Sequence, residues 1–134
     1  MSAAHRTDDP TSRVELRLAA VADRLPILRA ATEAFALVSD LDIDAVTDLK
    51  LAVDEACSEL MSRASAGAEL SCILSCNGDG VRVTASAALS VDADESSLGS
   101  GFGWHVLRTL TDEARISHAH AEAGVTVIEF VKRR

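Results

Sequence analysis

The stretch LAVDEACSEL, residues 51–60, brings together three carboxylates, Asp54, Glu55 and Glu59. If the stretch is helical, Glu55 and Glu59 lie one turn apart and repel each other by roughly 0.2–0.5 kcal/mol. One interpretation is a catalytic site, in which a carboxylate on a rigid helix serves as a general base or as an oxygen ligand for Mg²⁺. The other is the solvated face of an ordinary helix, which the spacing by itself favours.

A glycine pair forms the second candidate site. Gly101 and Gly103 follow Ser100 and precede an apolar segment with helical spacing. Backbone N–H groups at the start of a helix can hold an anion such as phosphate. A simple turn into a helix also favours glycine, so both interpretations stay open from the sequence.

The three cysteines are expected to be buried free thiols. If residues 69–76 form one strand, Cys72 and Cys76 lie about 13 Å apart at the usual rise per residue. A disulfide needs Cα atoms roughly 4.4–6.8 Å apart, so these two cannot pair within that strand. Cys57 stands alone, and no zinc-binding spacing is present. Free thiols favour a reducing, cytoplasmic environment.

Composition limits the possible partners. The 134 residues are 48% hydrophobic, enough for one domain with its own core. The 21 acidic and 13 basic residues give a net charge of −8, and no stripe of Lys or Arg is present. Direct binding to nucleic acid is therefore not expected, whereas an acidic surface suits a basic protein partner. No apolar run approaches the roughly 18 residues of a membrane span, so no membrane association is expected.

The hydrophobic pattern predicts the elements that position these sites. Residues 1–12 are predicted to be a flexible tail and residues 90–100 a mobile loop. Helices are predicted at 23–38, from Asp40 or Asp42 to about residue 63, and at 103–113. The second of these carries an apolar stripe of Ile43, Val46, Leu49, Val53, Cys57 and Leu60. Along it, Lys50–Asp54 and Glu59–Arg63 are predicted ion pairs, four residues apart.

Strands are predicted where apolar and polar residues alternate, at 13–20, 69–76, 81–89, 114–121 and 124–132. The Asn-Gly and Asp-Gly steps at 77–80 predict a hairpin, and Gly124 predicts a second turn. The resulting order describes an α/β sandwich. Its sheet is expected to be mixed, mostly antiparallel, and covered on one face by the three helices.

This order of elements, the acidic patch and the segment GSGFGWHVLRTLTDE resemble the GHKL (Bergerat) ATPases. Within them the chain is similar to the RsbW/SpoIIAB group of anti-sigma factors, over a single domain at 13–134. The resemblance implies binding of a sigma factor, homodimers, and ATP with Mg²⁺ as cofactors. It also implies phosphorylation of a serine on a STAS-type anti-anti-sigma partner.

The resemblance assigns roles to particular residues. Glu55 matches the general base of the family's E-A-x-x-N sequence, and Glu59 stands where the family has its Mg²⁺-binding Asn. The adenine-reading Asp falls at Ala85, or at Ser86 if the register shifts by one. The glycines that follow it fall at Ala87 and Leu89. The phosphate-binding positions match Ser100, Gly101 and Gly103, and the final-strand threonine matches Thr126.

Two functions from different classes follow. The first is a binding protein, an anti-sigma factor whose nucleotide site is degenerate and which antagonist proteins release from its sigma factor. The second is an active ATP-dependent serine kinase that phosphorylates one of those antagonists. We favour the first, because the adenine-reading and metal-binding positions lack the polar residues typical of the family. Phosphoryl transfer depends almost wholly on positioning and charge neutralisation, which such a site supplies poorly.

Overall fold

The computed structural model describes residues 12–90, 102–119 and 124–134. The tail predicted over 1–12 lies outside this part of the chain except for Ser12. The loop predicted over 90–100 lies outside it except for Ser90. Ser100 and Gly101 also fall outside it, so the structure does not place these two predicted site residues.

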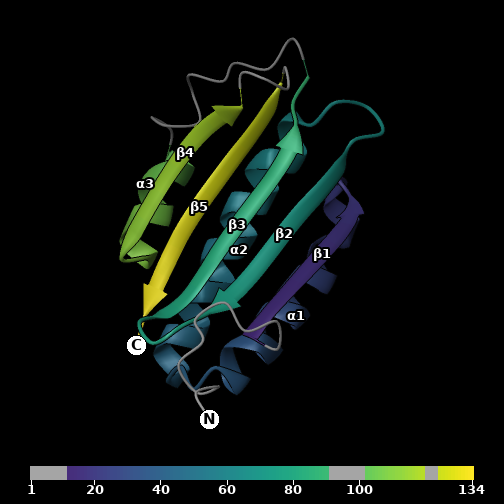
Figure 1. Ribbon diagram of the computed structural model, residues 1–134. Coiled ribbons are helices and arrows are strands. Elements are labelled where there is room, and N and C mark those ends of the chain that lie inside the picture. The colour runs from purple at the N-terminus through teal and green to yellow at the C-terminus, as the bar shows by residue number, and fades with distance from the viewer. Residues whose placement is uncertain (1–11, 91–101, 120–123) are drawn as a thin grey trace.

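A five-stranded sheet forms one layer of the molecule (Figure 1). Its strands lie in the order β1-β2-β3-β5-β4, and all four pairings are antiparallel. The bounds are Arg13–Ala19 (β1), Glu69–Cys76 (β2), Gly80–Ala88 (β3), Glu113–Ala119 (β4) and Val125–Arg133 (β5). Both predicted turns are confirmed, since β2 pairs with β3 and β4 pairs with β5.

The prediction of a mixed sheet is wrong. Strands β3 and β4 run in the same direction, but β5 lies between them and is antiparallel to both. Between β1 and β2 the chain reverses direction three times, into α1, into α2 and into β2, so β2 returns antiparallel to β1. Nothing local in the sequence shows that the last strand is inserted between β3 and β4.

Three α-helices in the described part of the chain lie behind the sheet in Figure 1. They are α1 (Leu25–Val38), α2 (Ile43–Arg63) and α3 (Phe102–Leu110), and a 3₁₀ turn at Ala22–Arg24 precedes α1. The predicted start of α2 is confirmed, because the Asp42 carboxylate accepts a hydrogen bond from the Ala45 backbone N–H at 2.8 Å. None of these helices has the length and apolarity that a membrane-crossing segment requires.

The core lies between the helices and the inward face of the sheet. Most of the predicted stripe of α2, namely Val46, Leu49, Val53, Cys57 and Leu60, is buried. Ile43 is exposed, contrary to the prediction. It is the first residue of α2, and the helix is first buried at Ala45.

The ion pairs of α2 depend more on the helix that packs beside it than on the spacing of charges along α2. Glu59 and Arg63 pair at 3.3 Å, as predicted. The predicted pair Lys50–Asp54 is wrong. Lys50 Nζ contacts Glu33 Oε1 at 3.1 Å and Arg29 Nε contacts Asp54 Oδ1 at 2.6 Å, both across the groove between α1 and α2. Because α1 and α2 run antiparallel, these opposite charges face each other. The sequence of α2 alone does not show that the partners of Lys50 and Asp54 lie on α1.

Candidate functional site

Helix α2 holds Glu55 and Glu59 one turn apart against the first turn of α3. At Gly103 an added side-chain carbon would overlap Glu55 Oε2 and lie 3.1 Å from Glu59 Oε1. Both carboxylates therefore approach the α3 backbone as closely as they do because residue 103 has no side chain. The structure thus brings the acidic patch and one member of the glycine pair into contact.

Apolar side chains close the space around this contact. Trp104 and Leu107 of α3 and Ile128 of β5 line it together with Ala56 of α2. The remaining cavity measures about 10 Å³. This is roughly the room that one water molecule needs.

The electrostatics of the site disfavour charge on Glu55. Partial burial raises the pKa of Glu55, and the neighbouring carboxylates Glu59 and Asp54 raise it further. Of the site's three carboxylates, Asp54 is held by Arg29 and Glu59 by Arg63. A carboxyl with a raised pKa is the kind of group that serves as a proton acceptor near neutral pH.

The predicted adenine-reading positions lie inside strand β3. Ala85 and Ala87 are both buried on the face of the sheet that the helices cover. Across the β3–β5 ladder, Ala85 pairs with Ile128 and Ala87 pairs with Thr126. Thr126 is fully buried as well, and its pairing with Ala87 places it beside these two positions. At Ala85 and Ala87 the sheet presents methyl groups, with no side-chain hydrogen-bonding group.

The metal-binding prediction rests on Glu59 and its neighbours. In the described part of the chain, no three side chains of His, Cys, Asp or Glu are grouped so that they could hold a metal ion. Mg²⁺ is usually held by only one or two carboxylates together with substrate phosphates, so a site of that kind depends on the nucleotide itself.

The cysteines behave as packing residues. All three are free, with Cys57 and Cys72 buried and Cys76 partly exposed. A hydrogen bond to Cys72 and burial both raise the pKa of the Cys57 thiol. The prediction of buried free thiols is confirmed for Cys57 and Cys72 and is wrong for Cys76, which is partly exposed. A thiol held in its neutral form is a poor nucleophile, so a reactive role is disfavoured for Cys57.

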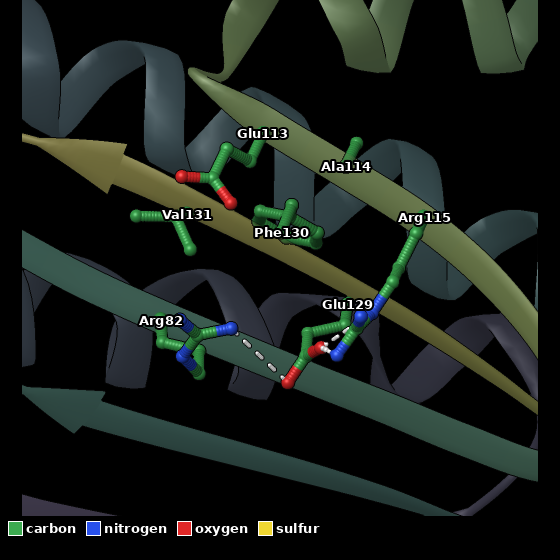
Figure 2. Close-up of a pocket in the computed structure, with 7 residues that line it drawn as sticks. All are labelled: Arg82, Glu113, Ala114, Arg115, Glu129, Phe130 and Val131. Carbon is green, nitrogen blue, oxygen red and sulfur yellow. Dashed lines mark hydrogen bonds and ion pairs between the residues drawn. The ribbon is translucent and has the colours of Figure 1, made fainter.

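A separate network that the sequence analysis missed lies on the outward face of the sheet. Figure 2 shows Arg82 and Arg115 on either side of Glu129, around a hollow of about 220 Å³. Glu129 accepts from Arg115 Nη2 at 2.6 Å and lies 3.3 Å from Arg82 Nη1. Burial alone would raise the pKa of Glu129, but the Arg115 hydrogen bond and both guanidinium charges lower it. The alternation of residues along each strand is enough to predict that these side chains point outward. The pairing of Arg82 and Arg115 with Glu129 depends on the strand order β3-β5-β4, which no local pattern shows.

Comparison with known proteins places this geometry in a family. Residues 18–132 match the family described as "Histidine kinase-like ATPase domain". The chain belongs to this family. Members typically bind ATP with Mg²⁺, and the predicted GHKL fold is confirmed.

The relatives are similar in sequence and in fold. The chain is 41% identical to the anti-sigma-F factor RsbW of Mycobacterium tuberculosis, in strains CDC 1551 and H37Rv, over 105 residues. This match covers 78% of the chain and 61% of the relative, so the chain spans about three fifths of the relatives' length. The crystal structure of the RsbU and RsbW domains of a M. tuberculosis protein superposes with a TM-score of 0.63 at 22% identity. That match covers 92% of this chain and 33% of the other, and it supports the fold.

Proposed function

We propose that this protein is an anti-sigma factor that sequesters a sigma factor by surface contact and that its nucleotide site is degenerate. The first half of the proposal is supported by the 41% identity to proteins named anti-sigma-F factor RsbW. An anti-anti-sigma protein of the STAS type would release the sigma factor by competing for the same chain. Such a mechanism needs complementary surfaces and no chemical step.

The second half is supported chiefly by the contact between Gly103 and the two glutamates. Ligand pockets usually measure roughly 300–1,000 Å³, whereas the cavity that the described residues line at Glu55, Glu59 and Gly103 measures about 10 Å³. Triphosphate oxygens placed here would face two carboxylates. The buried methyl groups of Ala85 and Ala87 offer adenine no hydrogen bond. The described residues of this site therefore do not fit Mg²⁺-ATP.

One observation favours a second function, an active ATP-dependent serine kinase. Glu55 stands at the position of the family's general base, and its raised pKa suits a group that accepts a proton from a serine hydroxyl. In that case the helix α3 must move away from α2 to admit the nucleotide. The two functions share the sigma factor as partner and differ in nucleotide use.

Calorimetric titration of the purified protein with Mg²⁺-ATP separates the two functions. We expect no binding in the micromolar range, because the site lacks its adenine contact and carries an extra carboxylate. Micromolar binding that Glu55→Ala or Glu59→Ala abolishes would overturn the degenerate site in favour of the kinase. Affinity purification from the native cell tests the shared partner, and the absence of any sigma factor among the bound proteins would contradict the anti-sigma assignment.

A further inference from the structure

Exposed large hydrophobic side chains gather in one part of the molecule. In the described residues, all of them lie between Val14 and Leu51. Five belong to the hairpin of α1 and α2, namely Ile27 (47% exposed), Leu37 (50%), Val38 (79%), Ile43 (72%) and Leu51 (52%). Apolar residues that cluster on a surface mark sites of interaction more often than scattered ones do.

On α1 these residues form a second apolar stripe, opposite the one that packs on the core. Ile27, Ala30, Ala34 and Leu37 are exposed and recur at spacings of three and four, so they share one side of the helix. The side that packs on the core carries Leu25, Leu28, Thr32, Phe35 and Ala36. A surface helix of a monomeric protein normally has one apolar side, and α1 has two.

Helix α2 extends this surface. Ile43, Thr47 and Leu51 are exposed and lie four residues apart, on one side of α2. The ion pairs Arg29–Asp54 and Glu33–Lys50 tie the two helices together. They hold the exposed stripes of α1 and α2 side by side as one face. We call this surface the hairpin face: Ile27, Ala30, Ala34, Leu37, Val38, Ile43, Thr47 and Leu51.

The hairpin of α1 and α2 is acidic as a whole. Residues 25–63 carry eight acidic and three basic side chains, a net charge of −5. Asp40, in the turn between the helices, and Asp44, in the first turn of α2, are exposed beside Val38 and Ile43 in the chain. The apolar surface is thus bordered by carboxylates at the end where it is most exposed.

We propose that the hairpin face is the docking surface for the sigma factor, and that it takes an amphipathic helix whose apolar side is flanked by Lys and Arg. The inference rests on the proposed function and names the surface that performs it. Charge decides between possible occupants. A second copy of the chain would bring the same acidic hairpin against itself, whereas basic flanks would neutralise Asp40 and Asp44.

The experiment uses the sigma factor that co-purifies with the full chain and is identified by mass spectrometry. Its affinity is measured by calorimetry for the wild type, for the double variant Leu37→Gln/Val38→Gln and for Ile43→Gln. Val21→Gln is the matched control, since Val21 is 47% exposed and lies outside both helices. Circular dichroism melts show that each variant is folded, and sedimentation gives the oligomeric state.

We expect the variants of the hairpin face to bind the sigma factor about tenfold more weakly or worse, as for central apolar contacts in interfaces, while Val21→Gln binds as the wild type does. Asp40→Asn/Asp44→Asn is expected to slow association and to weaken its dependence on salt. Equal binding by wild type and hairpin-face variants would overturn this inference and leave the anti-sigma function in place. Dimers of the wild type that these variants dissociate would overturn it in favour of self-association. Recovery of no sigma factor by the wild type would overturn the proposed function and, with it, this assignment of the surface.

Discussion

At the scale of single residues, the surroundings of Glu55 disfavour its charge. It lies between Asp54 and Glu59 in the sequence, and its carboxylate is pressed against Gly103. Asp54 and Glu59 each have an arginine partner, but the described structure records none for Glu55. A residue placed this way costs stability when ionised, which is typical of positions kept for binding or catalysis rather than for folding.

Glu55→Gln is expected to raise the free energy of unfolding at pH 7 by a few tenths of a kcal/mol, because it removes like-charge repulsion along α2. The folded-state pKa of Glu55 is raised, so the folded protein binds its proton more tightly than the unfolded chain. The wild type therefore loses stability as the pH rises from the ordinary carboxyl value near 4.5 through the raised pKa.

Urea denaturation of wild type and Glu55→Gln between pH 4 and pH 7 measures this difference. The gap between the two proteins should widen toward neutral pH and close in acid. Glu33→Gln serves as the comparison, since Glu33 lies on α1 and pairs with Lys50. If Glu55→Gln is less stable than the wild type at pH 7, the charged carboxylate of Glu55 stabilises the fold, which contradicts the repulsion by Asp54 and Glu59 inferred from the structure.

At the scale of secondary-structure elements, cross-strand pairs hold the last strand between β3 and β4. Glu129 lies directly opposite Thr84 of β3 and Arg115 of β4, so one carboxylate joins three strands. Arg82 reaches it from the diagonal position on β3. The network explains how a strand that follows β4 in the chain is secured between β3 and β4.

Glu129→Gln is expected to lower the free energy of unfolding at pH 7 by about 0.5–1 kcal/mol, a range typical of partly exposed ion pairs. The folded-state pKa of Glu129 is lowered, so its contribution is present above the ordinary carboxyl pKa and is lost as the pH falls through the lowered value. The variant should therefore lose less stability than the wild type on acidification below about pH 4.5. Chemical denaturation across this range measures it, and equal acid sensitivity of both proteins would contradict the assigned ion pairs.

At the scale of the whole molecule, negative charge is distributed unevenly. The net charge is −8, of which the α1–α2 hairpin contributes −5. The hollow on the opposite face of the sheet has balanced charges, with Arg82 and Arg115 against Glu113 and Glu129 (Figure 2). A basic partner is therefore attracted chiefly toward the helical side of the molecule.

The association rate with the sigma factor is expected to fall by about an order of magnitude between roughly 0.05 and 0.5 M salt, because the Debye length shortens from over 10 Å to below 5 Å. The dissociation rate should change much less, since apolar contacts are not screened. Stopped-flow or surface-based kinetics at several salt concentrations measure both rates. An association rate that is independent of salt would show that the acidic hairpin does not guide the partner.

The sequence by itself determined the elements, most of the core and the acidic character of α2. These depend on local periodicity, on caps such as Asp42 and on turn residues such as Gly124, all of which act within a few residues. The tertiary structure decided the insertion of β5 between β3 and β4, the pairing of Lys50 with Glu33, and the contact of Gly103 with Glu55 and Glu59. The contacts of β5 with β3, of Lys50 with Glu33 and of Gly103 with the two glutamates each join segments at least 17 residues apart. Such contacts depend on which elements pack together, and that follows from the burial of the whole chain.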